Sequence, residues 1–388
     1  MIKLNRSQEA VIALLGREGP LTRRQLCSST GLSWAVIAKT VSQLGSAGFL
    51  KDGETLPTRR RGRNPGEVVF SDKYVMAGIS VGKDAVSYFL LELNFTLVLS
   101  GEERLAPGDD PVPVINRCLE KMFSKFGKRI ISVGISFPGI ISSDCGTIIK
   151  SVDFPECDGR NIRNEIKTAL RFDIPVIIER NAVCNLNYLK LADKVTEDIL
   201  LVSACHGVST ALMIDGEIIH GRRGGIGEIG HLEISSLPGN ADGTIPCECG
   251  RINCVETMVG GKSWQRRWEE MRVRKSTLPE DIYEAVGKAV PSALELVGSS
   301  MDFIYPYLSF LVRFFRPEKL FFVLNLPESS SIVITTCLIR CFEKDGATEI
   351  PEMNFIFKND GKTGRGAALL GFELLSGNPY YRKLSKGL

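Results

Sequence analysis

At 388 residues, with 44% hydrophobic and 24% charged side chains, the chain has the composition of an ordinary globular protein of two or three domains. Its first residues interrupt apolar positions with charge, unlike a signal peptide, and no uncharged apolar run approaches the roughly 18–20 residues of a membrane span. We therefore expect a cytoplasmic protein without membrane insertion. Eleven cysteines, an odd number, favour metal binding over a complete disulfide framework.

The net charge of +3 conceals an uneven distribution along the chain. Residues 1–66 carry eleven Lys and Arg against four Asp and Glu, whereas the remaining residues carry 37 basic and 41 acidic side chains. A basic head on a slightly acidic body is expected of a nucleic-acid-binding domain joined to a domain with a second function. A merely soluble basic tail is the alternative, and the patterning of the head argues against it.

The head begins with two predicted helices. The first lies in NRSQEAVIALLGREG, where apolar residues recur at helical spacing until Gly16 and Gly19 end it. The second begins at Thr22 as its N-cap and stops at Gly31.

A third helix is predicted in SWAVIAKTVSQLGSAG, capped by Ser33 and closed by Gly45 or Gly48. We expect its apolar face to consist of Val36, Ile37, Val41 and Leu44. Two short helices joined by a glycine-containing turn form a helix-turn-helix, whose second helix enters the major groove of DNA. A strand at residues 49–50 and a tight turn in KDGE at 51–54 would complete a winged helix.

The candidate DNA contacts in the recognition helix are Ser33, Trp34, Ala35 and Lys39. Ser33 and Lys39 suit phosphates or base edges, and Ala35 can touch a thymine methyl group. For Trp34, packing against the wing is the alternative to DNA contact. The basic charge of the head and the arginine run that follows it favour DNA binding.

Residues 58–67, TRRRGRNPGE, are predicted to form a linker because proline and glycine punctuate them. The linker carries four arginines in five positions, Arg59, Arg60, Arg61 and Arg63. Arginines on an extended segment can lie in a narrow A·T-rich minor groove, where the negative potential is strongest. A solvated hinge with phosphate contacts only is the alternative.

From residue 68 onward, strands and helices alternate. A first α/β unit is predicted from strands in KYVMAGISVG, AVSYFLLELN, FTLVLSGEERL, RIISVGISFPGIIS and IPVIIERNAV, with helices at 112–127 and 161–172. A second unit has strands in DILLVSACHGVSTALMIDGEII and PEKLFFVLN, a long helical region at 279–315, and a glycine turn opening a helix in TGRGAALLGFELL. Two units of similar order predict two lobes with a cleft between them.

Five motifs occur in the order VGISFPG, GEIGH, C-x-C-G-x-x-x-C-x-E, PEKLFFVLN and GRGAALLG. They resemble the ROK family of repressors, open reading frames and sugar kinases, and the N-terminal winged helix makes the chain similar to the repressor branch. The resemblance implies an α/β chain in which a winged helix-turn-helix precedes a two-lobed actin-like, ribonuclease-H-like sugar-kinase fold with a structural zinc site. The expected domains are a winged helix at 1–57, a basic linker at 58–67, a first lobe at 68–190, and a second lobe at 191–388 whose C-terminal helix can return to the first.

His231, Cys247, Cys249 and Cys254 supply one nitrogen and three sulfurs. They form a closed tetrahedral set of Zn²⁺ ligands that leaves no position for water, so the metal is expected to be structural rather than catalytic. Gly250 lets the chain turn back and bring Cys254 to the same ion. Ordinary buried thiols are the alternative.

The resemblance also implies that Glu228, His231 and Glu256 contact a sugar. Carboxylates accept hydrogen bonds from hydroxyl groups, and a metal-bound imidazole keeps a second nitrogen for one. Arg180 stands where the family has a neutral amide that touches sugar, and its guanidinium favours a phosphorylated or acidic ligand.

Phosphoryl transfer is not expected, because the residues that the family's kinases need differ here. SVGKD at 80–84 stands in place of an acidic, glycine-rich phosphate loop, and ACHGV at 204–208 in place of a later Gly-Thr-Gly turn. The position of the catalytic aspartate is occupied by Asn181, which cannot act as a general base.

The sequence therefore predicts a transcription regulator of carbohydrate metabolism, a repressor without kinase activity. As a homodimer or tetramer it would bind a roughly palindromic double-stranded DNA operator, and a sugar or sugar phosphate would change the lobe angle and, through the linker, the spacing of the heads. Two alternatives stay open. One is an active sugar kinase with an accessory DNA-binding domain, and the other is a repressor controlled by a membrane sugar-transporter protein.

Overall fold

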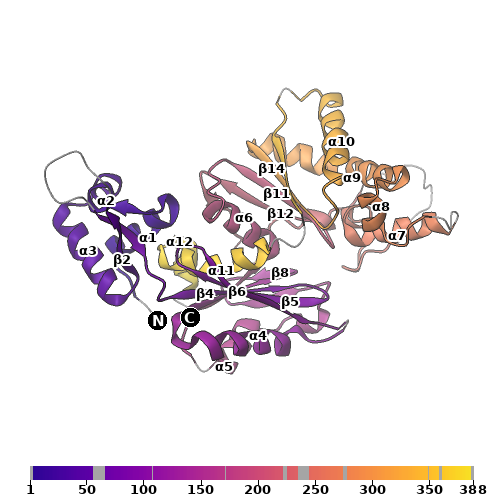
Figure 1. Cartoon of the computed structure of the whole chain (residues 1–388). Coiled ribbons are helices and arrows are strands. Elements are labelled where there is room, and N and C mark those ends of the chain that lie inside the picture. The colour runs from indigo at the N-terminus through magenta and orange to yellow at the C-terminus, as the bar shows by residue number, and fades with distance from the viewer. Residues whose placement is uncertain are drawn as a thin grey trace. The chain divides into compact units, whose positions relative to one another are not determined.

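The computed structural model of the chain describes residues 3–55, 66–106, 108–170, 172–221, 225–234, 244–273, 278–347, 349–357 and 361–385 (Figure 1). The chain forms two compact units. Unit 1 comprises residues 1–195, 220–224 and 362–388, and unit 2 comprises residues 196–219 and 225–361. Within the described ranges, no helix is both long enough and apolar enough to cross a membrane.

A winged helix forms the N-terminal part of unit 1. Its elements are α1 (Arg6–Glu18), β1 (Leu21–Thr22), α2 (Arg23–Thr30), α3 (Trp34–Ala47), β2 (Leu50–Thr55) and β3 (Gly66–Phe70), with the strands in the order β1-β3-β2. Thr22 caps α2 through a capping box with Gln25, and Gly31 ends this helix in the left-handed conformation, as predicted. Ser33 and Gly48 are the caps of α3, so the later of its two predicted ends is confirmed.

Two details of the head differ from the prediction. Gly16 lies inside α1 rather than at its end, because the ring of Phe372 packs so closely that a Cβ atom on Gly16 would lie 2.2 Å from it. The tight turn predicted at 51–54 is wrong, because these residues belong to β2, which pairs antiparallel with β3. Residues 56–65, which include most of the predicted linker, lie outside the described part of the chain. The last two residues of the predicted linker, Gly66 and Glu67, begin β3 and pair with β2 and β1 of the head rather than forming a linker.

The rest of unit 1 is built on a five-stranded sheet in the order β10-β7-β4-β5-β6. The strands are β4 (Val75–Val81), β5 (Ala85–Glu92), β6 (Leu97–Arg104), β7 (Ile130–Phe137) and β10 (Val176–Arg180). The central β4 and β7 and the outer β10 run parallel, whereas β5 and β6 are added antiparallel. Every residue of β7 and β10 is buried, as expected for parallel strands covered on both faces.

Helices cover the two faces of this sheet. Alternate residues of β4, beginning with Val75, pack with α4 and α5, whereas Met76 shares a cluster with α11. The helices are α4 (Pro111–Phe126), α5 (Ile162–Ala169), α6 (Asn181–Leu191), α11 (Lys362–Leu375) and α12 (Pro379–Ser385). A small sheet of β8 (Ile140–Ser142) and β9 (Thr147–Lys150) precedes α5.

Glycines let the backbone of α11 pack directly against the backbones of neighbouring elements. A Cβ atom on Gly78 of β4 would lie 2.1 Å from the carbonyl oxygen of Gly364, and one on Gly134 of β7 would lie 1.8 Å from another carbonyl oxygen of α11. On its other side, Gly366 leaves room for the carbonyl oxygen of Cys184 in α6. The glycine turn predicted before this helix is therefore wrong: these glycines lie within α11 and serve its packing.

The head shares one hydrophobic cluster with α11. Leu15 of α1 and Leu93, which follows β5, belong to this cluster together with Phe372. The ring of Phe372 packs edge-on against Phe70 of β3 and against Phe95, with centroid distances of 6.0 Å and 4.8 Å. An ion pair between Glu9 of α1 and Arg382 of α12 adds a polar contact. The winged helix is thus joined to the sheet of unit 1 by packing as well as by the chain.

Unit 2 contains a second five-stranded sheet, in the order β13-β12-β11-β14-β15. Its strands are β11 (Ile199–Ala204), β12 (Ser209–Ile214), β13 (Glu217–Ile218), β14 (Lys319–Leu324) and β15 (Glu352–Phe357), and its helices are α7 (Gly261–Arg272), α8 (Ile282–Gly287), α9 (Pro291–Phe315) and α10 (Ser330–Lys344). The helical region predicted at 279–315 is two helices, because Ala289 adopts a positive φ of 53° and Pro291 starts α9.

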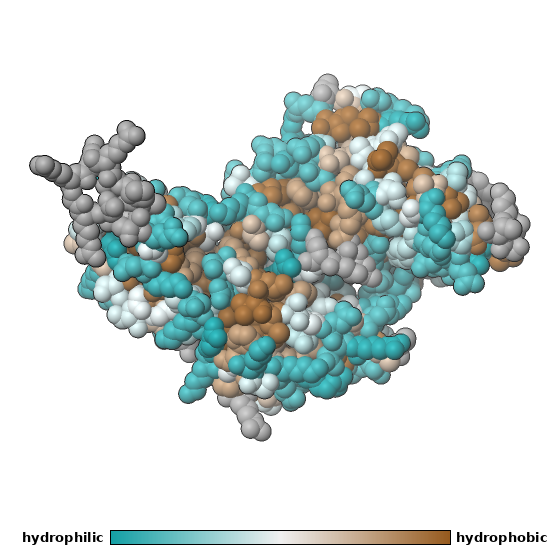
Figure 2. Space-filling model, in the orientation of Figure 1, coloured by the Kyte–Doolittle hydropathy of each residue, from teal (hydrophilic) through white to brown (hydrophobic). Residues whose placement is uncertain are grey.

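The visible face of the molecule in Figure 2 is mostly hydrophilic, with hydrophobic residues gathered in separate patches. Among the described residues, large apolar side chains that are at least 60% exposed are Trp34, Val273, Phe310, Phe314 and Ile332. Most large apolar side chains are instead buried in the clusters of the two units. Trp34 stands apart from the other exposed residues because it lies in the head.

Candidate functional site

The four predicted metal ligands come together in unit 2. His231 ends the 3-10 helix η3 (Ile229–His231), and Cys254 directly precedes the 3-10 helix η4 (Val255–Thr257). The two segments are joined by a backbone hydrogen bond of 2.9 Å from the first residue of η4 to the carbonyl oxygen of Leu232. This bond holds His231 and Cys254 close together although 22 residues separate them in the sequence.

A tight turn supplies the other two ligands. The N–H of Gly250 donates to the carbonyl oxygen of Cys247 at 2.9 Å, and the N–H of Cys247 donates to that of Arg251 at 2.8 Å. Gly250 has φ of +90°, a conformation that favours glycine. Asn253 has φ of +50°, which asparagine tolerates better than most residues.

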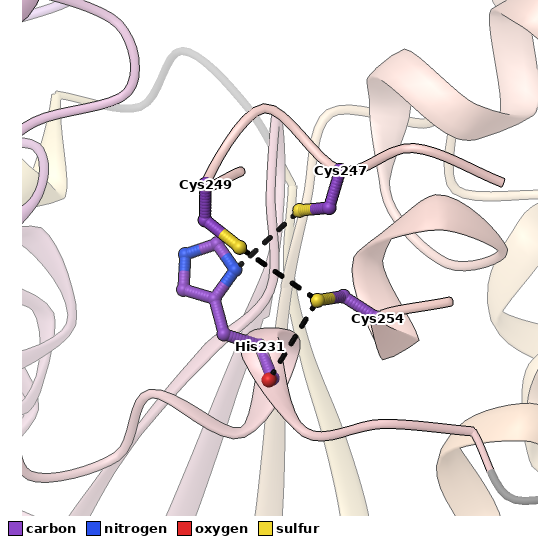
Figure 3. Close-up of side chains that lie close together, drawn as sticks. All are labelled: His231, Cys247, Cys249 and Cys254. Carbon is purple, nitrogen blue, oxygen red and sulfur yellow. Dashed lines mark hydrogen bonds between the residues drawn. The ribbon is translucent and has the colours of Figure 1, made fainter. Parts of the chain in front are cut away.

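The geometry of the four side chains fits a single metal ion (Figure 3). All four ligand atoms lie within 4.8 Å of one another. The Sγ atoms of Cys249 and Cys254 are 3.7 Å apart, and Cys247 Sγ lies 3.7 Å from His231 Nδ1. A tetrahedral ion with bonds of about 2.3 Å to sulfur requires separations of roughly 3.8 Å between ligand atoms. The cluster could therefore hold a metal ion.

The protonation of the three thiols is uneven. Burial raises the pKa of Cys247 and of Cys254. Burial also opposes ionisation of Cys249, but hydrogen bonds from the backbone and side chain of Arg251 and from the other two thiols lower its pKa to about 7. A metal ion binds thiolates, so it must displace protons from the other two cysteines, and its binding is favoured as the pH rises.

Glu256 faces the cluster. Its Oε1 atom lies 3.2 Å from His231 Nδ1 and accepts a hydrogen bond from Cys247 Sγ at 3.0 Å. Its Oε2 atom would lie 2.7 Å from a Cβ atom at Gly207, so glycine at that position makes room for the carboxylate. Two of the three predicted sugar contacts, His231 and Glu256, are thus in direct contact.

Glu228, the third predicted sugar contact, is half-buried and immediately precedes η3. The glycines of the GEIGH motif fix its position. A Cβ atom on Gly227 would lie 1.9 Å from the carbonyl oxygen of Thr210, and one on Gly230 would lie 2.2 Å from that of Val208. Both glycines are needed for close packing on β12 and the turn before it.

Arg180 and Asn181 lie in unit 1, where β10 ends and α6 begins. The Oδ1 atom of Asn181 accepts a hydrogen bond of 2.6 Å from Ser136 Oγ on the neighbouring β7. Arg180 is only 6% exposed and Glu179 only 2%. Charged side chains at this depth are rare unless they have a partner, and Glu179 has one in His220.

The predicted site residues do not include the polar cluster around Glu179. His220 Nδ1 lies 3.5 Å from Glu179 Oε1, and the imidazole stacks on Tyr380 with ring centroids 3.7 Å apart. Burial raises the pKa of Tyr380. The only sequence signal was that His220 is one of three histidines in the chain.

The two segments predicted to stand in place of the kinase phosphate loops lie at connections between strands. Residues 82–84 connect β4 to β5, and the N–H of Gly82 donates to the carbonyl oxygen of Ala85 at 2.9 Å. Lys83 and Asp84 are exposed at this turn. His206 and Gly207 form the turn between β11 and β12.

The candidate DNA contacts Ser33, Trp34, Ala35 and Lys39 are all exposed on α3. Trp34 is 60% exposed, so most of its side chain is accessible to a partner. Val36, predicted to lie on the apolar face, is 39% exposed, because the first turn of α3 extends beyond the buried residues that begin at Ile37. Arg59, Arg60, Arg61 and Arg63 lie outside the described residues.

Comparison with known proteins places these features in context. The model of the ROK family matches residues 76–372. The N-acetylglucosamine repressor of Escherichia coli O157:H7 is 21% identical over 365 residues, covering 88% of this chain and 86% of the relative. The xylose repressor of Bacillus subtilis (strain 168) is 27% identical over 269 residues, covering 66% of each chain.

Two solved structures share the fold. A ROK family transcriptional regulator, a homologue of the E. coli Mlc protein, superimposes with a TM-score of 0.78 at 20% identity and covers 98% of both chains. A ROK family glucokinase from Streptomyces griseus, in complex with glucose and AMPPNP, has a TM-score of 0.63 at 15% identity, covering 76% of this chain and 98% of its own. The chain thus has the α/β fold of ROK sugar kinases, and the regulator matches the winged helix as well.

Proposed function

The chain belongs to the ROK family, and on that premise we propose that it is a DNA-binding transcription regulator, a repressor of carbohydrate metabolism whose affinity for its operator changes with a sugar or sugar phosphate. The observation that supports this most is an exposed recognition helix on a chain that aligns almost end to end with a ROK regulator. We expect a homodimer or tetramer, because a two-fold pair of winged helices suits a palindromic operator.

A mobility-shift titration tests the proposal. The full-length protein is added to the DNA upstream of its own gene, and N-acetylglucosamine, xylose, glucose and their phosphates are titrated to millimolar concentrations. We expect one of them to change the apparent Kd for DNA by about 5–150-fold, the usual range of coupling between sites. If none does, the sensing half of the proposal fails while DNA binding stands.

We propose that the metal ion of the cluster is structural Zn²⁺, bound by His231, Cys247, Cys249 and Cys254. A donor set of one nitrogen and three sulfurs at tetrahedral spacing favours zinc over hard cations such as Mg²⁺. Four protein ligands leave no position for a reactive water molecule, so the ion would fix the positions of His231 and Glu256 and take no part in a reaction.

We propose that the effector contacts the residues predicted for it from the sequence, namely Glu228, His231, Glu256, Arg180 and Asn181. Carboxylates and an imidazole suit sugar hydroxyl groups, whereas the buried guanidinium of Arg180 suits a phosphate or carboxylate on the ligand. Isothermal titration of a sugar and its phosphate separates the two ligand classes. Arg180→Gln should weaken binding of the phosphate selectively.

Within unit 1, α6 and α11 offer a route from these residues to the head. Thr363 Oγ1 of α11 lies 2.9 Å from Asn185 Oδ1 of α6, and Asn187 Nδ2 donates to the carbonyl oxygen of Gly366 at 3.0 Å. The far end of α11 packs against α1 through Phe372. We propose that ligand binding at the start of α6 biases the head through this contact.

The runner-up function is a sugar kinase with an accessory DNA-binding domain, which the likeness to glucokinases keeps open. Asn181 argues against it, because its carboxamide oxygen accepts a hydrogen bond from the Ser136 hydroxyl and is too weak a base to deprotonate a sugar hydroxyl. ADP release on a panel of hexoses decides between the two. Turnover that is abolished by Asn181→Ala would establish a kinase.

A further inference from the structure

The first turn of α3 presents an apolar surface to solvent. Trp34 and Val36 are 60% and 39% exposed, and Ala35 between them is exposed as well. We name these three residues the apolar turn. Single exposed apolar residues are common and need no special cause, but here three exposed apolar residues follow one another in the first turn of an otherwise amphipathic helix. The buried side of α3 begins only at Ile37.

The helix-turn-helix that carries the apolar turn has no acidic side chain of its own. Residues 22–49, which contain the whole helix-turn-helix, include no Asp or Glu. Arg24 and Lys39 are exposed, and Arg23 is paired with Asp52 of β2. Exposed apolar side chains next to cations suit a negatively charged partner that also presents apolar groups. Duplex DNA is such a partner, since the thymine C5-methyl groups line its major groove.

The same turn lacks the side chains that most often form two hydrogen bonds with a single base. Residues 33–42 contain no Arg, Asn or Gln, and the Oγ atom of Ser33 accepts the capping hydrogen bond from the N–H of Val36 at 3.4 Å. Bidentate recognition of guanine uses Arg or Lys, and that of adenine uses Asn or Gln. Lys39 is the first cation, more than one helical turn further on.

We propose that the apolar turn recognises thymine methyl groups in the operator, so that this part of the protein selects its sequence by apolar contact rather than by hydrogen bonds. The inference rests on the proposed function, because it requires that α3 enters the major groove. It adds the chemical group that is recognised and the residues, Trp34 and Val36, that recognise it.

Uracil differs from thymine only by the absence of the C5-methyl group, so substituted DNA tests the proposal directly. The full-length protein first selects duplexes from a random-sequence pool, and the enriched duplex is resynthesised with uracil at one thymine at a time. Affinities are measured at a fixed salt concentration. At the contacted positions, uracil should weaken binding about fourfold per methyl group, as expected for one buried carbon.

Two variants and one control test whether Trp34 and Val36 cause the weaker binding of the uracil duplex. Trp34→Ala and Val36→Ala should bind the thymine duplex more weakly than the parent, and each should distinguish thymine from uracil less well at the position it contacts. Ser46→Ala, at the exposed C-terminal end of α3, should keep the parental ratio. Because Trp34 and Val36 are exposed, their substitution should leave the melting temperature nearly unchanged.

The possible outcomes separate the two proposals. A pool from which no sequence is enriched would overturn the proposed function. An enriched sequence that binds equally well with uracil at every position would overturn the methyl recognition alone. The same conclusion would follow if both variants kept the full preference for thymine over uracil.

Discussion

Cys249 is the residue of the metal cluster whose surroundings most favour the thiolate, since hydrogen bonds from Arg251 and the neighbouring thiols lower its pKa to about 7. Cys249→Ser replaces this ligand by a hydroxyl group that binds zinc poorly. We expect the purified variant to lose its one zinc ion per chain, measured by native mass spectrometry. Its melting temperature should fall as well, because the binding free energy of a structural metal contributes to folding.

Cys145→Ser is the matched control for this prediction. Cys145 is an exposed free thiol in unit 1 and belongs to no metal cluster among the described residues. This variant should retain zinc and the parental melting temperature. If Cys249→Ser retained both as well, the four residues would not be a zinc site.

Among single residues, the sequence predicted the contacts between residues that lie close together along the chain. The four metal ligands were predicted because three cysteines fall within eight positions, and the structure brings them together with His231. The contact of Glu179 with His220 and Tyr380 could not be predicted, because these residues belong to three segments that only the fold unites. The exposure of Val36 was missed because helical periodicity does not show how far a helix extends beyond its core.

Among the elements, α11 is the one whose packing tolerates least change. Gly366 lies inside this helix, and a Cβ atom there would stand 1.9 Å from the carbonyl oxygen of Cys184 in α6. Because backbone cannot move aside as a side chain can, Gly366→Ala should lower the free energy of unfolding of unit 1 by about 1–3 kcal/mol. Urea unfolding followed by circular dichroism measures this loss.

Gly45→Ala provides the comparison within another helix. Gly45 lies in α3, and the nearest atom to an added Cβ would be 3.8 Å away. The higher helix propensity of alanine should then stabilise the head by about 1 kcal/mol. Equal effects of the two substitutions would show that propensity, and not the contact of α11 with α6, determines the result.

A second prediction for the elements concerns the parallel pair β11 and β14. Lys319 Nζ, at the start of β14, lies 2.7 Å from Glu197 Oε1, and this hydrogen bond lowers the pKa of Glu197 from 4.5 to about 2. A lowered pKa in the folded state stabilises the protein above pH 4.5, and the stabilisation is lost as the pH falls towards 2. Glu197→Gln should therefore melt slightly below the parent at pH 7, and the difference should vanish near pH 2.

Glu352→Gln is the control for this effect, since it removes a carboxylate 3.9 Å from the same lysine. Its difference from the parent should be smaller and should depend less on pH. A difference between Glu197→Gln and the parent that is constant from pH 7 to pH 2 would contradict the assignment.

The existence and order of the strands could be predicted better than their ends. The buried strands β7, β10 and β14 coincide with short, continuous apolar runs, a pattern that is typical of strands covered on both faces. The wing was misplaced because β2 includes Gly53, a residue that usually indicates a turn. The glycines of α11 were predicted to form a turn because close packing against β4 and α6 is a tertiary property that the local pattern does not express.

For the whole molecule, the packing of the head on α11 and α12 changes how regulation can work. A head connected only by a linker would bind DNA independently of the body, so a ligand could alter only the spacing of two heads. A head that shares a hydrophobic cluster with Phe372 can instead be released or held by the body. A ligand can then change the affinity for DNA only to the extent that it binds the state with the released head and the state with the held head with different affinities.

Reversing the charge of Arg382 tests this coupling. Arg382 pairs with Glu9 across the contact between α12 and α1, and only 12% of the Glu9 side chain is exposed. Arg382→Glu places two carboxylates together and should favour the released head by roughly 1.5 kcal/mol, or about tenfold. Limited proteolysis should then cleave the head faster, and the effect of the effector sugar on DNA affinity should shrink while DNA binding itself remains.

The double variant Glu9→Arg, Arg382→Glu restores opposite charges with their positions exchanged. If the contact between α1 and α12 transmits the signal, the exchange should recover both the protease resistance of the head and most of the effector response. Recovery of protease resistance alone would show that docking stabilises the head without transmitting the signal. Regulation would then not depend on the packed contact between α1 and α12.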